Sequence, residues 1–159
     1  MYYYLIVIAV VAVDQFFKYL IVTYLTSSEL VSGGGITVIP GVFEIINVGN
    51  TGAAFNILQG QRLLLILFVA IIITALLVFI FLRRDKDKAI MLAAAALIAG
   101  GGTGNLIDRI RLGAVVDYLA FWSFPVFNAA DIAVCVGCGL TILHFVLLEY
   151  KARKDKGIH

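Results

Sequence analysis

The chain has 159 residues, of which 62% are hydrophobic and 14% are charged, and its formal net charge is +2. Soluble domains carry about 25% charged residues, so this composition excludes a soluble globular protein and indicates an integral membrane protein with a single domain, 1–159. The small net charge, without a basic stripe interleaved with aromatics, indicates no nucleic-acid partner.

The first predicted membrane span covers residues 3–25. It is apolar over the roughly 20 residues that a crossing helix needs. No Lys or Arg precedes it and no small-residue cleavage site follows, which argues against a cleaved signal peptide. Asp14 and Lys18 lie in its middle, where each charge costs about 2.5–3.5 kcal/mol. Their spacing of four residues puts them on one helical face. They form an ion pair that fixes this helix to its neighbours, or they take part in chemistry directly.

The segment 26–61 is the longest stretch without a membrane-type run. Gly33–Gly35 and Pro40-Gly41 indicate turns, and the β-branched runs 36–39 and 42–48 predict a small sheet. Open sheet edges are not viable in lipid, so the sheet is expected to rest on the membrane surface. Residues 50–55 (NTGAAF) then predict a tight loop, with a binding role as the alternative.

Three further spans are predicted at 63–82, 89–107 and 129–148. The third is rich in alanine and glycine, which allow close helix approach in lipid, so it is expected at the centre of the bundle. The predicted fold is therefore an all-α integral membrane protein, a four-helix transmembrane bundle with a small extracytoplasmic β-sheet between helices 1 and 2.

The distribution of basic residues predicts the orientation. Eight of the twelve Lys and Arg residues lie in the loop 83–88 and the tail 149–159. By the positive-inside rule these segments and both termini are cytoplasmic, in a multi-pass protein of the bacterial cytoplasmic (inner) membrane. Segments 26–61 and 108–128 then share the outer face.

Two acids on that outer face form a candidate catalytic pair. Asp117 and Asp131 flank a short aromatic loop between the third and fourth spans, and the outer ends of antiparallel neighbours meet. Two carboxylates that close cannot both ionise, so one keeps a proton. The ionised acid can accept a proton from water while the other polarises a carbonyl, which is the chemistry of aspartic peptide hydrolysis. The alternative is a pair of solvated surface acids.

Four motifs carry a family resemblance over essentially the whole chain. They are Asp14-Gln15-x-x-Lys18; Asn50-Thr-Gly-Ala-Ala-Phe55; Gly104-Asn105-Leu-Ile-Asp108-Arg109 with Gly113-x-Val-Val-Asp117; and Phe127-Asn128-x-Ala130-Asp131. With these motifs the chain resembles the lipoprotein signal peptidases (signal peptidase II), which are bacterial membrane aspartic proteases.

The resemblance implies an activity and a set of site residues. It implies cleavage of diacylglyceryl-modified prolipoproteins before the lipidated cysteine, inhibition by the cyclic peptide globomycin, and a surface β-cradle in the 26–61 segment. The implied catalytic residues are Asp117 and Asp131. The implied substrate-binding or site-supporting residues are Asp14, Lys18, Asn50, Gly52, Asn105, Asp108, Arg109, Asn128 and Ala130. No cofactor and no metal are expected; the expected partners are lipidated prolipoproteins and membrane lipids, and the protein is expected to be a monomer.

The spacing of the polar residues suggests individual roles. Asp108 and Arg109 share a helical face with Asn105 and are expected to satisfy each other. Asn128 lies three residues before Asp131 and is expected to cap the fourth span while orienting that carboxylate. Asn50 is expected to bind the substrate backbone, and Asp14 to support the sheet from below.

The substrate's acyl chains are expected against the apolar faces of the second and third spans. Aromatic residues of the last outer loop are expected to form an interfacial belt or to close over the site. These are Phe121, Trp122, Phe124 and Phe127.

Other chemistries have weaker sequence support. His144 lies deep in the fourth span and is expected to pack between helices, and no His/Glu spacing resembles a zinc site. Cys135 and Cys138 have the spacing of a redox pair, so a membrane thiol oxidoreductase is the principal alternative. Both are instead interpreted as buried thiols, because reactive cysteines need an electropositive, partly exposed site. A small transporter is the third possibility, since charges inside spans often mark pathways.

Overall fold

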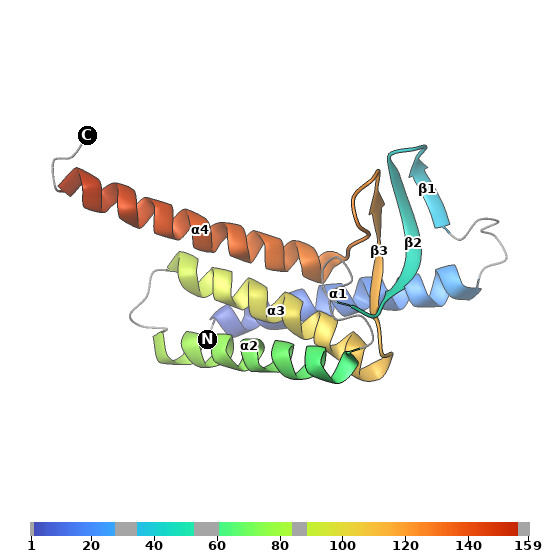
Figure 1. Cartoon of the computed structure of the whole chain (residues 1–159), viewed down its shortest axis with the longest axis horizontal. Coiled ribbons are helices and arrows are strands. Elements are labelled where there is room, and N and C mark those ends of the chain that lie inside the picture. The colour runs from blue at the N-terminus through green and yellow to red at the C-terminus, as the bar shows by residue number, and fades with distance from the viewer. Residues whose placement is uncertain (1, 28–34, 53–60, 84–88, 156–159) are drawn as a thin grey trace.

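The computed structural model describes residues 2–27, 35–52, 61–83 and 89–155 (Figure 1). The elements in chain order are α1 (Tyr2–Ser27), β1 (Gly35–Ile39), β2 (Phe43–Asn50), α2 (Arg62–Arg83), α3 (Ala89–Arg111), β3 (Val115–Phe121) and α4 (Ala129–Asp155). The predicted cytoplasmic residues 84–88, the second half of the 50–55 loop and the last four residues lie outside the described part.

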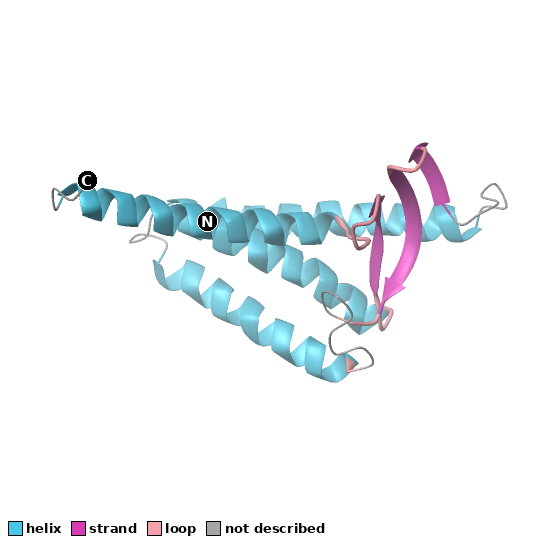
Figure 2. Ribbon diagram, turned by 45° about the horizontal axis from the view of Figure 1, so that its top comes forward, coloured by secondary structure: helices cyan, strands magenta, loops and turns pink. Residues whose placement is uncertain are grey.

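The four helices are each long and apolar enough to cross a membrane, as the sequence predicts. They run side by side, and the sheet lies at one end of them with its strands crossing the helix direction (Figures 1 and 2). Both termini lie towards the opposite end, where α2 ends and α3 begins.

Helix α3 lies between the other three helices and packs against each of them, which confirms its predicted central position. Its small residues make this possible: a Cβ at Gly100 would press on Val10 of α1, and a Cβ at Gly101 would overlap the Ala130 carbonyl of α4. In lipid, association depends on such close packing rather than on a hydrophobic driving force.

The sheet has three antiparallel strands in the order β1-β2-β3. The hairpin β1–β2 matches the prediction for the 26–61 segment, but the third strand comes from between α3 and α4. Within that ladder Val48 pairs with Asp117 and Asn50 pairs with Val115. The expectation that 108–128 is only a loop joining two helix ends is therefore wrong: it contains the last turn of α3 and a buried strand.

Candidate active site

Asp117 lies in the middle of strand β3, not at a helix end as expected. The strand is built from β-branched and aromatic residues that suit a pleated, half-buried surface. The side chain of Asp117 is only 3% exposed. Asn50 pairs with the residue two positions before Asp117, so both side chains lie on one face of the sheet, and Asn50 Nδ2 donates to Asp117 Oδ2 at 2.9 Å.

Asp131 lies in the first turn of α4 and takes part in a reciprocal helix cap. Asn128 Oδ1 accepts from the Asp131 backbone N–H at 3.0 Å, and Asp131 Oδ2 accepts from the Asn128 N–H at 3.1 Å. Each side chain thus satisfies a backbone donor that a helix start leaves free. The predicted cap by Asn128 is confirmed, and it fixes where the Asp131 carboxylate points.

Hydrogen bonds from two asparagines link the two carboxylates. Asn128 Nδ2 donates to Asp117 Oδ1 at 2.6 Å, while the backbone of the same residue binds Asp131. Asn105 Nδ2 donates to Asp131 Oδ1 at 2.8 Å. Both acids line one cavity of about 360 Å³. The fold therefore brings Asp117 and Asp131 to the same cavity from a strand and a helix.

The environment of Asp117 favours its protonated form. Burial raises its pKa from 3.8 to about 6, the negative charge of Asp131 adds to the rise, and the hydrogen bonds from Asn50 and Asn128 oppose it. Deprotonation of a carboxylic acid near neutral pH is typical of a group that exchanges protons in a reaction.

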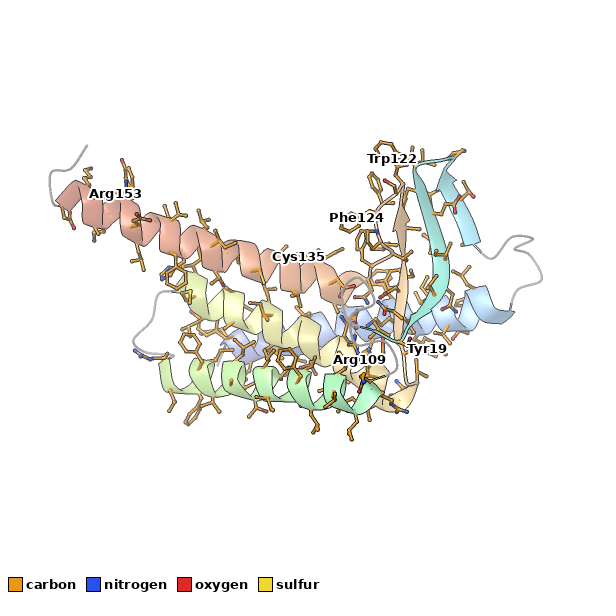
Figure 3. The ribbon with its side chains drawn as sticks, viewed as in Figure 1. Tyr19, Arg109, Trp122, Phe124, Cys135 and Arg153 are labelled. Carbon is orange, nitrogen blue, oxygen red and sulfur yellow. The ribbon has the colours of Figure 1, made fainter. Side chains whose placement is uncertain are left out.

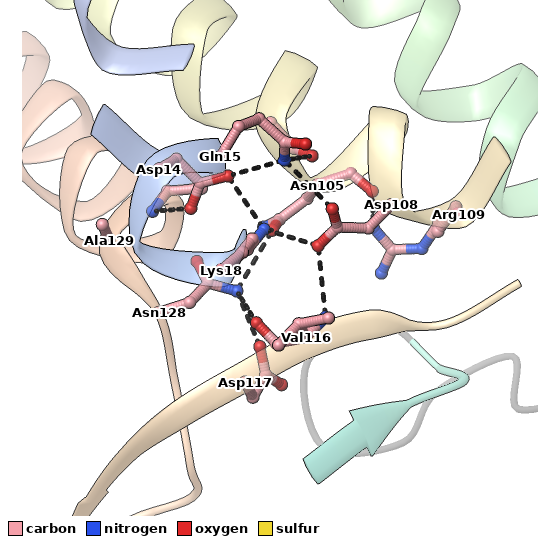
Figure 4. A network of polar contacts seen from close by, with 12 residues as sticks. Asp14, Gln15, Lys18, Asn105, Asp108, Arg109, Val116, Asp117, Asn128 and Ala129 are labelled. Carbon is pink, nitrogen blue, oxygen red and sulfur yellow. Dashed lines mark hydrogen bonds and ion pairs between the residues drawn. The ribbon is translucent and has the colours of Figure 1, made fainter. Parts of the chain in front are cut away.

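A buried ion cluster lies behind the two acids, between α1 and α3 (Figure 4). Lys18 Nζ lies 2.9 Å from Asp14 Oδ2 and 2.7 Å from Asp108 Oδ2. The predicted pairing of Asp14 with Lys18 is confirmed. The predicted pairing of Asp108 with Arg109 is wrong, because Asp108 turns towards α1 and also accepts from the Val116 N–H at 3.2 Å.

Asp14 supports the site by a contact that the sequence did not indicate. Its Oδ1 accepts from the Ala130 backbone N–H at 3.0 Å, so a side chain of α1 caps the N-terminus of α4. Ala130 has no exposed surface. The expectation that Asp14 supports the sheet is replaced by this helix cap.

Arg109 lines the cavity and binds backbone carbonyls. Its guanidinium donates to the Gly52 carbonyl at 2.7 Å and to the Asn105 carbonyl at 3.4 Å. Its Nε is buried and has no hydrogen-bond partner among the residues that the structure describes. Gly52 in turn donates its N–H to Asn50 Oδ1 at 3.0 Å. Asn50 thus binds Asp117 through Nδ2 and the Gly52 N–H through Oδ1 while it also lines the cavity, and its expected contact with substrate backbone stays a prediction.

The cavity has a polar floor and an apolar wall. The floor is formed by Asn50, Asn105, Arg109, Asp117 and Asp131, and the wall by Val115, Phe124, Pro125, Val126, Phe127, Val134 and Cys135. The described part of α2 contributes no lining residue, and the apolar surface next to the acids lies on α4, on 124–127 and at Val115 of β3. The expected contact of the acyl chains with the second and third spans stays a prediction.

The aromatic residues separate into two groups. Phe124 and Phe127 line the cavity and contact each other edge to face, with ring centroids 5.7 Å apart. Trp122 is 82% exposed at the end of β3 (Figure 3), and neither it nor Phe121 lines the cavity. The first group lines the site, and the second has the exposure of an interfacial belt.

Cys135 and Cys138 are both exposed and free, so the expectation that they are buried is wrong. In a bundle this small, one side of every outer helix faces the lipid rather than a neighbour. His144 is buried in α4, as expected for a packing residue.

Three residues outside the predicted site also support it. Gln15 Nε2 donates to Asp108 Oδ1 at 3.0 Å and to the Gly104 carbonyl at 3.2 Å. Arg62 donates to the carbonyls of Arg109 and Ile110 at the end of α3, at 2.8 and 2.9 Å. The Tyr118 hydroxyl accepts from the Ala129 N–H at 3.2 Å. Gln15 lies within a recognised motif, whereas the other two contacts join distant segments and leave no pattern in the sequence.

The donor set gives no indication of a metal centre. Among the residues that the structure describes, no group of three His, Cys, Asp or Glu side chains is placed to hold a metal ion.

Comparison with known proteins gives consistent matches over most of the chain. Residues 6–147 match the family model described as signal peptidase (SPase) II. A lipoprotein signal peptidase of Brevibacillus brevis is 39% identical over 155 residues, covering 96% of this chain and 100% of that relative. A lipoprotein signal peptidase of Symbiobacterium thermophilum is 42% identical over 152 residues, covering 92% of this chain and 96% of that relative. A solved "Bacterial membrane enzyme structure by the in meso method at 2.3 A resolution" is 34% identical, with a TM-score of 0.78, covering 94% of this chain and 89% of that one.

Proposed function

The chain belongs to the signal peptidase II family of lipoprotein signal peptidases, and from this premise we propose that Asp117 and Asp131 form its catalytic pair. Membership makes the protein a multi-pass membrane peptidase that removes signal peptides from prolipoproteins. The observation that carries the proposal is the joint placement of the two carboxylates in one cavity, linked through Asn128.

The mechanism divides the work between the acids. Asp117 keeps the shared proton because its side chain is buried. Ionised Asp131 accepts a proton from a water molecule held between the two acids. The resulting hydroxide attacks the scissile carbonyl, whose oxygen receives a hydrogen bond from protonated Asp117. The tetrahedral intermediate then collapses, and the leaving amine takes up a proton from the pair.

The substrate is a diacylglyceryl-modified prolipoprotein, cleaved just before its lipidated cysteine. The apolar wall formed by 124–127 with Val134 and Cys135 adjoins the two acids, and it offers a surface for an acyl chain that stays in lipid. A globomycin-type cyclic peptide is expected to compete for the same cavity. We propose that the monomer is the active unit, because one four-helix bundle can contain all four sequence motifs.

The site faces outward from the bacterial cytoplasmic membrane, and both termini are cytoplasmic. Two facts support this orientation: the basic 149–155 segment ends α4 far from the sheet (Figure 1), and the cavity lies beside the sheet. The positive-inside rule assigns the basic end to the cytoplasm.

Asn50→Ala is expected to move the pH dependence of cleavage upward. The Asn50 hydrogen bond lowers the pKa of Asp117, which is about 6 with this bond in place, so removing the bond should raise that pKa. Activity needs the protonated acid and falls as pH rises through this pKa. The alkaline limb of kcat/KM, which reports the free enzyme, should therefore shift to higher pH. Thr51→Ala, at an exposed neighbouring position, is the control and should leave the limb in place. An unmoved or lowered limb for Asn50→Ala would contradict the assignment.

The two thiols separate the proposed peptidase from a thiol oxidoreductase. Alanine at both Cys135 and Cys138 is expected to leave cleavage of a lipidated peptide within about twofold of wild type, because neither thiol enters the chemistry. Loss of turnover in that double variant would favour the redox alternative.

A bulky residue should distinguish the two positions. Both cysteines are exposed on α4, but only Cys135 lines the cavity. We expect Cys135→Trp to raise KM for a lipidated peptide about tenfold, because the indole would occupy space beside the apolar wall of the cavity. A tenfold change corresponds to about 1.4 kcal/mol of binding free energy. Cys138→Trp is the matched control with unchanged KM. Equal changes in KM at the two positions would contradict binding of the acyl chain at this wall.

A further inference from the structure

The ammonium of Lys18 has three protons and three acceptors. It contacts Asp14 Oδ2 at 2.9 Å, Asp108 Oδ2 at 2.7 Å and Asn105 Oδ1 at 2.8 Å, as Figure 4 shows. A lysine ammonium has three N–H donors and no acceptor. The side chain is 3% exposed, so these contacts use its full capacity. Two of the acceptors are carboxylates that balance its charge, but the third is a neutral amide oxygen.

That third contact determines which way round the Asn105 amide lies. The oxygen and NH₂ ends of an amide have nearly the same size, so hydrogen-bond partners decide its orientation. An ammonium can face only the oxygen. With Oδ1 held by Lys18, the Nδ2 group points to Asp131 and donates to its Oδ1 at 2.8 Å.

The other two asparagines of the site are oriented by backbone. Asn50 Oδ1 accepts from the Gly52 N–H and Asn128 Oδ1 accepts from the Asp131 N–H, both at 3.0 Å. Each therefore presents its NH₂ group to Asp117. All three amides follow one rule: a donor fixes the oxygen, and the NH₂ group serves a carboxylate. Of the three, Asn105 is the one whose orientation depends on a charged side chain.

The second donor to Asn105 is a weaker determinant. Asn128 Nδ2 lies 3.1 Å from Asn105 Oδ1, but the same NH₂ group also lies 2.6 Å from Asp117 Oδ1 and 3.4 Å from the Val116 carbonyl. Two hydrogens are shared among three acceptors, and the shortest contact goes to Asp117. Lys18 is therefore the principal donor that holds the Asn105 oxygen.

We propose that Lys18 is a positioning residue for cleavage: held by Asp14 and Asp108, its ammonium fixes the Asn105 amide so that the NH₂ group orients Asp131. Lys18 does not line the cavity of the two acids. It lines a separate pocket of about 90 Å³ with Gln15, Tyr19 and Asp108, so it acts through Asn105 rather than on the substrate. The inference rests on the proposed function of Asp131.

Removal of the ammonium should lower turnover more than substrate binding. Without Lys18 the Asn105 amide can turn over and place its oxygen against the Asp131 carboxylate, which repels it. We expect kcat to fall about 10- to 100-fold, the range seen when a supporting hydrogen bond of a reacting group is lost. KM should change by less than about threefold, because Lys18 lies outside the cavity wall.

The test is a double-mutant cycle between position 18 and Asn105, measured with a lipidated prolipoprotein peptide in detergent micelles. Lys18→Met alone leaves two buried acids without the positive charge that balances them, so the cycle also uses the neutral triple variant Asp14→Asn, Lys18→Met, Asp108→Asn. Asparagine keeps an acceptor for the N–H groups of Ala130 and Val116, which now bind the acids. Thermal melting of each variant monitors the fold.

If Lys18 acts through Asn105, adding Asn105→Ala to the triple variant should lower kcat by less than about threefold further. Asn105→Ala alone should lower kcat as much as the triple variant does. Three results would each overturn the inference: kcat losses of the triple variant and Asn105→Ala that multiply when combined, a wild-type kcat in the triple variant, or an effect on KM alone. Asp131→Asn and Asp117→Asn in parallel keep the two hypotheses apart. If either variant cleaves at the wild-type rate, the proposed function fails, whereas inactive acid variants with multiplying losses of kcat refute only the role of Lys18.

Discussion

Asp117→Asn and Asp131→Asn are each expected to abolish cleavage, with kcat reduced by at least about 10²–10⁴-fold, the contribution of a positioned acid or base. An asparagine cannot accept the proton of water at position 131, nor donate a carboxyl proton at position 117. Losing either acid stops the cycle, so the two effects should not add in the double variant. The measurement is cleavage of a lipidated prolipoprotein peptide by purified protein.

The same substitutions should leave the fold intact. Asparagine at 131 keeps an oxygen for the Asn128 backbone N–H, so α4 retains its cap and melting should change little. Glu149→Gln is the control, since Glu149 is exposed on the same helix and pairs only weakly with Arg153. It should cleave at the wild-type rate. Wild-type turnover from Asp131→Asn or Asp117→Asn would contradict the proposed mechanism.

Gly104→Ala is expected to cause a large loss of stability. A Cβ at this position would overlap the carboxylate of Asp14, which has no exposed surface. Asp14 would have to leave Lys18 and the Ala130 N–H that it caps. Overpacking of this kind costs about 1–3 kcal/mol, and the broken buried hydrogen bond adds about 1–3 kcal/mol. A drop of several degrees in melting temperature, with loss of activity, is the expected result.

Gly139 offers the matched control within a membrane helix. Among the described residues, a Cβ there meets nothing within 4 Å, and alanine is favoured over glycine in a helix interior by up to about 1 kcal/mol. Gly139→Ala should therefore melt at or above the wild-type temperature. If Gly104→Ala behaves in the same way, the close approach of α1 and α3 is not what holds Asp14.

The features predicted correctly from sequence depend on local patterns. Hydropathy is a property of a continuous segment, so the four apolar helices were predictable. The pairing of Asp14 with Lys18 follows from a spacing of four residues, and the cap of Asn128 on α4 from a spacing of three. Each of these contacts lies within one helix or at its end.

The features that the sequence did not predict depend on distant partners. Asp117 was expected at a helix end because its strand is short and becomes a strand only by pairing with β2, more than sixty residues earlier. Asp108 was paired with its neighbour Arg109, yet its partner Lys18 lies on another helix. The apolar segment around the cysteines predicts buried thiols, but apolar side chains of a membrane helix face lipid as readily as protein.

The shared ladder of β2 and β3 ties the outer hairpin to the acid pair. Val48 sits opposite Asp117, and the next pairs along the ladder run to Asn50. A hairpin that swung outward as a separate flap would break these pairs or carry the carboxylate with it. A molecule that pulled β2 away from β3 would therefore break the contact of Asn50 with Asp117 without entering the cavity.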